Sequence, residues 1–146
     1  MTGWIDKFFE DYAGAFRSNS KAGILQKFTI PLIFLAPHGP IVLNDVERVS
    51  ANLDVLLTRY QQIGAVDFKY AIGNAKRIGS GIHLIEVEWQ FLDAAGELIY
   101  ACNTSYFLAG ENSADAKVMG LIAHNENNEY QKALSRKQFS EKANKS

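Results

Sequence analysis

Residues 66–91 read VDFKYAIGNAKRIGSGIHLIEVEWQF, and in this stretch two alternating segments flank a glycine-rich turn. Apolar and aromatic side chains occupy every second position before and after the turn, a pattern typical of half-buried strands. A loop of two or four residues places Tyr70 opposite Trp89 and Phe68 opposite Phe91. The stretch therefore predicts an antiparallel hairpin with one aromatic face.

A third strand extends this hairpin, because a second turn at residues 93–96 precedes another alternating segment, residues 97–109. A last strand is expected over residues 117–125. An even loop at the second turn places Trp89 on the same face as Tyr100, Cys102, Thr104 and Tyr106. This face is aromatic with a few polar groups, which is the composition of a ligand pocket.

The N-terminal segment has helical periodicity. Four aromatic residues recur at every fourth position, namely Trp4, Phe8, Tyr12 and Phe16. Only a helix places side chains with this spacing on one face. Thr2 is expected to cap the start of the helix, and Asn19 to end it in a left-handed conformation.

A second amphipathic helix precedes the long strands. Asn44 stands in the capping position three residues before Glu47, and Gly64 stands where a helix C-terminus favours a left-handed residue. Between the two long helices the sequence predicts shorter elements. We expect a short helix at residues 21–28, a strand at 31–35, a returning strand at 41–43 and the second long helix at 46–63.

The length and composition of the 146 residues exclude several classes of function. The length suits one domain, which we place at residues 1–125, with residues 126–146 as a polar C-terminal tail or short helix. Fifteen basic and sixteen acidic residues leave no basic stripe, so nucleic-acid binding is not expected. Cys102 is the only cysteine, which excludes an intramolecular disulfide and a multi-cysteine metal site.

The sequence also lacks the patterns of export and membrane insertion. The N-terminal segment has no basic region followed by a continuous apolar run, and no apolar run approaches the roughly 20 residues of a membrane helix. We expect a cytoplasmic protein that does not enter a membrane. No metal-binding motif and no phosphate-cradling glycine loop is present, so neither a metal nor another cofactor is expected.

The order of these patterns resembles the nuclear transport factor 2-like superfamily, in particular its SnoaL-like and ketosteroid-isomerase-like branch. The resemblance covers residues 4–125 and rests on three stretches: FFEDYAGAFRSNSKAGILQKFTIPLIFLAP, DVERVSANLDVLLTRYQQIG and KVMGLIAHN. It implies an α+β fold, in which a cone-shaped, curved, mostly antiparallel sheet wraps around three N-terminal helices. It also implies a pocket at the open end and, commonly, dimers packed on the outer sheet.

Ketosteroid isomerases within this superfamily allow a comparison residue by residue. Their tyrosine of the first helix falls on Tyr12, and their phenylalanine of the second helix falls on Phe28. The position of their proton-abstracting aspartate falls on Ala36, and their second acid falls near Thr104 or Ser105. By this resemblance the chain has a possible oxyanion donor in Tyr12 but lacks both acids. The isomerase mechanism would therefore need a base from another position.

Two residues are candidates for acid–base chemistry. Tyr12 could donate a hydrogen bond to a ligand carbonyl, although a packed aromatic residue with a satisfied hydroxyl is the simpler interpretation. His124 lies near the end of the last strand and could exchange a proton near neutral pH, whereas most histidines at strand ends are only exposed. The expected ligand-binding residues are Tyr70, Trp89, Tyr100, Cys102, Thr104 and Tyr106.

The leading hypothesis is a domain that binds a small apolar or aromatic molecule in an internal pocket. One alternative is a cofactor-independent acid–base enzyme, such as an isomerase, a dehydratase or a polyketide cyclase. Another is a homodimeric interaction module with a filled interior, paired through an outer sheet face that includes Ile99, Ala101 and Phe107.

Overall fold

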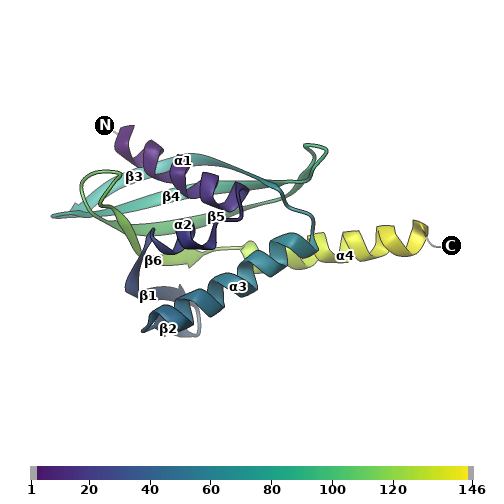
Figure 1. Ribbon diagram of the computed structural model, residues 1–146, viewed down its shortest axis with the longest axis horizontal. Helices are drawn as coiled ribbons and strands as arrows, with labels where there is room; N and C mark the ends of the chain where they lie inside the picture. The colour runs from purple at the N-terminus through teal and green to yellow at the C-terminus, as the bar shows by residue number, and fades with distance from the viewer. Residues whose placement is uncertain (1–2, 145–146) are drawn as a thin grey trace.

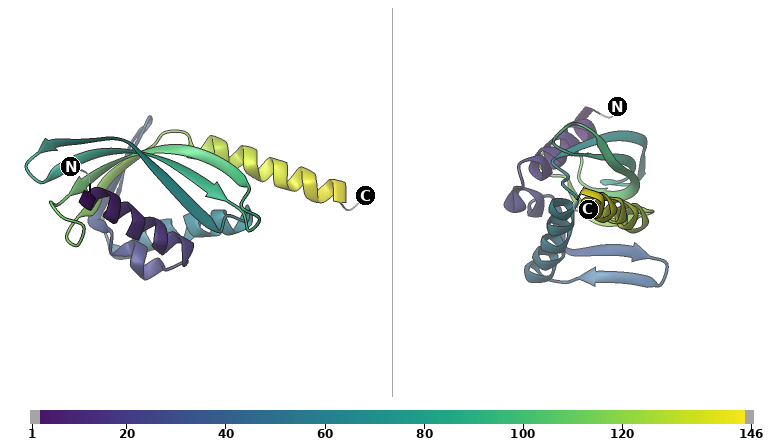
Figure 2. Two further views of the ribbon diagram at one scale, coloured as in Figure 1. Left: turned by 90° about the horizontal axis from the view of Figure 1, so that it is seen from above. Right: turned by 90° about the vertical axis from the view of Figure 1, so that its right-hand side faces the viewer.

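The computed structural model describes residues 3–144, with side chains up to Phe139. Within these residues, one curved sheet arches over three helices, and a fourth helix extends from one end of the sheet (Figures 1 and 2). The elements are α1 (Gly3–Arg17), α2 (Lys21–Leu25), β1 (Phe28–Ala36), β2 (Gly39–Leu43), α3 (Val46–Gln62), β3 (Asp67–Gly79), β4 (Ile82–Leu92), β5 (Leu98–Ala109), β6 (Lys117–Ala123) and α4 (Glu126–Asn144).

The sheet is open and mixed, with the strand order β2-β1-β6-β5-β4-β3. All neighbouring strands are antiparallel except β1 and β6, which are parallel. This arrangement confirms the predicted α+β class with a curved, mostly antiparallel sheet around α1, α2 and α3. None of the described helices is long and apolar enough to span a membrane.

The predicted register of the long strands is confirmed. Tyr70 pairs with Trp89 and Phe68 pairs with Phe91 between β3 and β4. Trp89 also pairs with Cys102 of β5, so these aromatic side chains share one face of the sheet. The alternation of side chains, together with bulges in both strand pairs, therefore fixes which residues point toward the helices.

Most helix boundaries follow local chemistry. Asn19 and Gly64 have φ angles of 53° and 74°, so both adopt the predicted left-handed conformation after α1 and α3. The cap of α3 is Asp45 rather than Asn44, because the Asp45 side chain accepts a hydrogen bond from the backbone N–H of Arg48 at 2.9 Å. The predicted cap Thr2 lies outside the described residues.

Several segments differ in length from the prediction, and the strands β1 and β2 are longer than expected whereas β6 is shorter. Helix α2 ends at Leu25 and is therefore shorter than the predicted helix at residues 21–28. Phe28, at the end of that predicted helix, is the first residue of β1. The chain from Glu126 forms a helix of 19 residues, where a polar tail or a short helix was expected. Tyr130 and Ala133 of this helix are buried, which shows that α4 packs against the rest of the protein.

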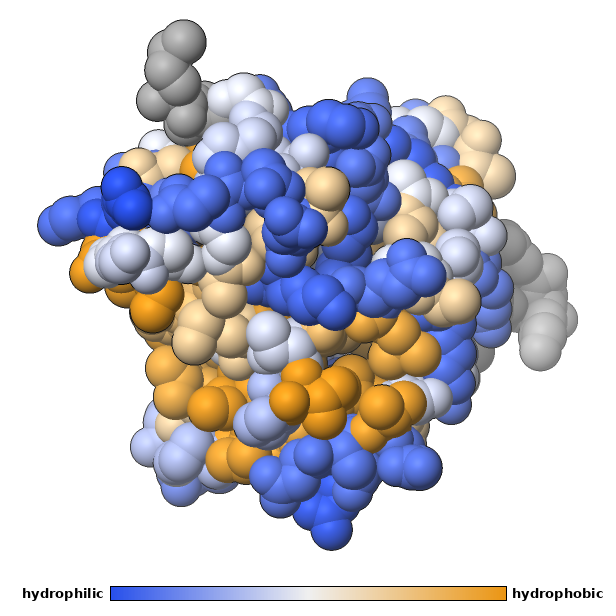
Figure 3. All heavy atoms as spheres, turned by 60° about the vertical axis from the view of Figure 1, so that its left-hand side comes forward, coloured by the Kyte–Doolittle hydropathy of each residue, from blue (hydrophilic) through white to orange (hydrophobic). Residues whose placement is uncertain are grey.

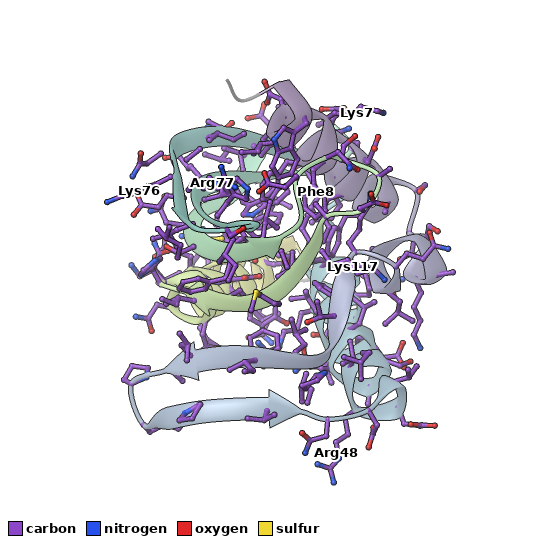
Figure 4. The ribbon with its side chains drawn as sticks, turned by 90° about the vertical axis from the view of Figure 1, so that its left-hand side faces the viewer. Lys7, Phe8, Arg48, Lys76, Arg77 and Lys117 are labelled. Atoms are coloured by element: carbon purple, nitrogen blue, oxygen red, sulfur yellow. The ribbon has the colours of Figure 1, made fainter. Side chains whose placement is uncertain are left out.

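An aromatic core joins α1 to the sheet. Phe8, labelled in Figure 4, and Phe9 are completely buried. The Phe9 ring centroid lies 5.1 Å from that of Tyr106 and 6.5 Å from that of Trp89. Tyr12, a member of the predicted aromatic stripe, has its ring centroid 5.9 Å from that of Trp89 and 6.0 Å from that of Tyr106, so α1 packs this stripe against the inner face of β4 and β5.

The β1–β2 hairpin diverges from the other strands. Strand β1 pairs with β6 only at Phe28, Ile33 and Phe34, and Figure 4 shows the hairpin running along the bottom, apart from β3, β4 and β5. Ile41 and Val42 of β2 are exposed. Figure 3 accordingly shows apolar surface in the lower part of the molecule, at the height of this hairpin.

Candidate functional site

A cavity of about 270 Å³ lies between α1, α3 and the inner face of the sheet. Most of its wall is apolar, and aromatic rings from four strands and two helices form much of it. Polar groups enter at a few places, which is the usual composition of a small-molecule site. The aromatic lining residues are Tyr12, Phe16, Phe28, Phe34, Tyr60, Phe68, Trp89, Phe91 and Tyr106.

Four of the predicted site residues line this cavity, namely Tyr12, Trp89, Thr104 and Tyr106. The Trp89 indole Nε1–H donates a hydrogen bond to the Tyr106 hydroxyl at 2.8 Å. Phe28, the position matched to the ketosteroid isomerases, lines the cavity as well. The inner face of β4 and β5 therefore contributes to the cavity as the alternating pattern predicts.

Burial makes Tyr12 a neutral hydrogen-bond donor. Desolvation raises the pKa of its phenol, and the neighbouring Tyr106 hydroxyl offsets part of this rise. The negative charge of Glu126 raises the pKa further. Tyr12 consequently keeps its proton at any ordinary pH and can offer it to an acceptor in the cavity.

Three predicted ligand-binding residues of the strands lie outside the cavity wall. Tyr70, on the edge strand β3, donates its hydroxyl hydrogen bond to the backbone carbonyl of Asp6 at 2.9 Å. Burial, together with the charge of Asp6, raises the pKa of Tyr70 to about 12. Cys102 is only 1% exposed, and burial raises the pKa of its thiol. Tyr100 packs its ring against Phe91 at a centroid distance of 4.6 Å.

His124 does not reach the cavity. Its Nε2 atom lies 2.8 Å from the Ser105 hydroxyl oxygen, and its side chain is exposed. Ser105 stands between two cavity-lining residues of β5, so it points to the opposite, outer face of the sheet. The structure therefore places this candidate base on the wrong side of the sheet to act on a molecule inside.

Glu126, which the sequence patterns did not single out, supplies the carboxyl group of the cavity. It is the first residue of α4, it lines the cavity and it is half-buried. The Tyr60 hydroxyl donates a hydrogen bond to Glu126 Oε1 at 2.6 Å. The Tyr100 hydroxyl lies 3.5 Å from the same oxygen, a longer and weaker contact.

The environment of Glu126 disfavours its charged form. Burial raises the pKa of this carboxyl group, whereas the hydrogen bonds from Tyr60 and Tyr100 and the charge of Arg59 lower it in part. The net direction is upward. A carboxyl group with a raised pKa in a cavity can exchange a proton closer to neutral pH than an exposed one.

The remaining polar groups of the wall lie on α3 and the first turn of α4. Asn52, Arg59 and Asn127 line the cavity. The Arg59 guanidinium lies over the ring of Tyr130, with 5.3 Å between its central carbon and the ring centroid. Among residues 3–144, no cluster of three or more histidine, cysteine, aspartate or glutamate side chains could hold a metal ion.

A family model described as "NTF2-like protein (DUF6841)" matches residues 3–126 of the chain. No curated protein matches the sequence. The match of the family model covers α1 through the first residue of α4, and so includes every residue of the cavity wall except Asn127.

Several solved structures share this fold. An NTF-2-like protein of unknown function from Shewanella oneidensis superposes with a TM-score of 0.64 at 10% identity, covering 84% of this chain and 97% of that one. A domain of unknown function with a cystatin-like fold from Nostoc punctiforme gives 0.60 at 15% identity, covering 81% and 72%. A ketosteroid isomerase-like protein from Erwinia carotovora atroseptica gives 0.54 at 12% identity, covering 82% and 92%. At these identities the likeness concerns the fold alone.

Proposed function

The chain belongs to the family of NTF2-like proteins DUF6841, and from this premise we propose that it is a small-molecule-binding domain. Its ligand is a compact, largely apolar molecule that carries one or two rings. The cavity of about 270 Å³ supports this size, because it lies just below the usual range of ligand sites, roughly 300–1,000 Å³. Extended molecules such as long acyl chains fit this volume poorly.

The observation that carries the proposal is the wall of the cavity. Tyr12, Trp89 and Tyr106 present aromatic surface that is almost completely shielded from solvent, yet a hollow remains between them and α3. Aromatic walls gain free energy when an apolar ring replaces water. An open hollow also speaks against the alternative of an interaction module whose interior is filled by side chains.

A thermal-shift screen with aromatic acids, phenols and ketones of one or two rings tests the proposal, and four-ring steroids serve as compounds that the cavity should exclude. A ligand present at 100 times its Kd stabilises the protein by about 2.7 kcal/mol, which is a readily measured shift. The variant Leu56→Trp places an indole in the cavity wall and should abolish the shift, whereas Val46→Trp, on an exposed site of the same helix, should keep it. The absence of any stabilising compound, or an undiminished shift in Leu56→Trp, would overturn the proposal.

The carboxyl group of Glu126 favours a second candidate function, a cofactor-independent acid–base enzyme. Glu126 lines the same cavity as Tyr12, so it supplies the titratable group that His124 does not. In such a reaction the Glu126 carboxylate takes a proton from the carbon beside a ring ketone, and Tyr12 donates a hydrogen bond to the enolate oxygen. The proton then returns to a carbon of the same molecule.

Hydrogen exchange tests this second candidate without knowledge of the substrate. The protein is incubated with 2-tetralone in D2O, and the loss of the C1 protons is followed by NMR against a protein-free sample. Acceleration by the protein that disappears in Glu126→Gln, with Glu129→Gln as the matched control on α4, supports the enzyme. Exchange at the protein-free rate leaves only the binding function.

We also propose that two copies of the chain pair through the outer face of the sheet. Ala101 and Phe107 are half-buried on this face of β5. Ile99 is also half-buried, but its carbonyl accepts a hydrogen bond from Arg136, so α4 lies beside that end of the strand. Light scattering on the native chain and on Phe107→Glu tests the pairing. A native mass of one chain would contradict it.

A further inference from the structure

The Glu126 carboxyl group is held in place from two sides. Tyr60, on α3, donates to its Oε1 atom at 2.6 Å, and the Tyr100 hydroxyl of β5 lies 3.5 Å from the same atom. Both phenol rings belong to residues that are at most 6% exposed. The carboxyl group is therefore oriented before any ligand arrives, which lowers the cost of binding.

The two oxygens of this carboxyl group differ in their surroundings. Both phenols approach Oε1, and no described residue forms a hydrogen bond with Oε2. Glu126 is nevertheless part of the cavity wall. A carboxylate oxygen has two lone pairs and accepts hydrogen bonds but does not donate them, so Oε2 offers a vacant acceptor.

Resting on the proposed binding function, we infer that Glu126 selects ligands that carry a hydroxyl group, so that the ligand is a compact ring-bearing alcohol or phenol. The ring lies among the aromatic side chains of the wall, and the hydroxyl hydrogen bonds to Glu126 Oε2. A bond from a neutral hydroxyl to a carboxylate is charge-assisted and roughly twice as strong as one between neutral groups.

The charges around Glu126 favour a neutral donor over an ion. Arg59 lines the same cavity and lowers the pKa of Glu126 through its positive charge, so a ligand cation would meet a second positive charge there. A ligand anion would meet the Glu126 carboxylate itself. Either ion would also lose its hydration in a mostly apolar cavity, whereas a hydroxyl loses much less.

Calorimetric titration with 2-naphthol and 2-methoxynaphthalene tests this selection, and it is run at pH 8 because the raised pKa of Glu126 favours the charged form toward higher pH. The two probes share the ring system, and only the first can donate a hydrogen bond. The native protein should bind 2-naphthol at least tenfold more tightly, a ratio that corresponds to about 1.4 kcal/mol. In Glu126→Gln the carboxylate charge is lost and the ratio should fall below about threefold, whereas Glu129→Gln should retain the native ratio.

Each outcome separates the inference from the proposed function. Equal affinities of the native protein for the two probes would overturn the inference and leave the binding function intact. An unchanged ratio in Glu126→Gln would overturn it as well. The comparison of the probes in the native protein does not depend on how well a variant folds, and circular dichroism melting verifies the fold of both variants. If neither probe binds, the inference is overturned, and the thermal-shift screen decides the proposed function separately.

Discussion

The indole N–H of Trp89 and the hydroxyl oxygen of Tyr106 are joined by a buried hydrogen bond of 2.8 Å. Trp89 is 5% exposed and Tyr106 is 4% exposed, so solvent does not compete for either group. The bond links β4 to β5 at the wall of the cavity, and the same Tyr106 hydroxyl influences the pKa of Tyr12. These side chains consequently hold one another in the orientation that leaves the hollow open.

Removal of the Tyr106 hydroxyl should destabilise the protein. Tyr106→Phe leaves the buried Trp89 N–H without its partner, and an unsatisfied buried donor costs about 1–3 kcal/mol. Urea denaturation followed by Trp fluorescence measures the difference. Tyr70→Phe is the matched control, because its hydroxyl bonds to Asp6 at the surface and its loss should cost about 0.5 kcal/mol or less. Equal decreases in the free energy of unfolding of the two variants would contradict the stabilising role of the buried hydrogen bond.

The aromatic core of α1 should tolerate truncation poorly. Phe9 is completely buried, and its ring contacts those of Tyr12, Trp89 and Tyr106. Phe9→Ala should cost about 3–5 kcal/mol, since the mutation removes buried apolar surface and leaves a cavity. Phe139→Ala on α4, where the ring is 76% exposed, should change the free energy of unfolding by about 0.5 kcal/mol or less. A Phe9→Ala loss as small as this would show that the core re-forms around the gap.

Local sequence patterns predict the sheet and its register well. Alternating side chains determine which residues of β3, β4 and β5 face the helices, and this alternation is a short-range property. The loop between β4 and β5 has an odd length rather than the predicted even one, and a bulge at Ile99 restores the predicted facing. The same alternation explains why the His124 side chain, a predicted catalytic candidate, lies outside the cavity. Leu121 and Ala123 line the cavity, so the next residue along the chain points outward.

The carboxyl group of the site depends on long-range packing, which a local pattern does not reveal. Glu126 begins a polar segment, and it reaches the cavity because α4 packs against β5 and the end of α3, where the Tyr130 hydroxyl donates to Gln62 Oε1 at 2.7 Å. One signal was present in the sequence. Glu126, Tyr130 and Ala133 are spaced as one face of a helix, and the two apolar members of this face are buried.

Substitution of alanine for glycine should change the free energy of unfolding in opposite directions at two positions. Gly110 has a φ angle of +134°, and a Cβ atom there would lie 2.7 Å from Ala116 Cα, so Gly110→Ala should destabilise by more than about 1 kcal/mol. Gly14 lies inside α1 with open space around it, and Gly14→Ala should stabilise by about 0.5–1 kcal/mol. Thermal unfolding of both variants measures the two signs. Destabilisation by Gly14→Ala would contradict the packing described for α1.

The raised pKa of Glu126 predicts how stability changes with pH. Burial lifts the pKa of this carboxyl group in the folded protein above its ordinary value of 4.5, so the folded state holds the proton more tightly than the unfolded chain. The resulting contribution to the free energy of unfolding is fully present below pH 4.5. It is lost as the pH rises through the pKa of the folded state. Glutamine does not titrate and makes no such contribution.

The comparison of native protein with Glu126→Gln isolates this effect. The free energy of unfolding of the native protein, minus that of the variant, should be largest below pH 4.5 and should decrease toward pH 8. Urea denaturation at several pH values measures this difference, and the same series on Glu129→Gln shows what the loss of one negative charge from α4 does by itself. A difference that grows with pH would mean that the hydrogen bonds from Tyr60 and Tyr100 outweigh burial and lower the pKa of Glu126 instead.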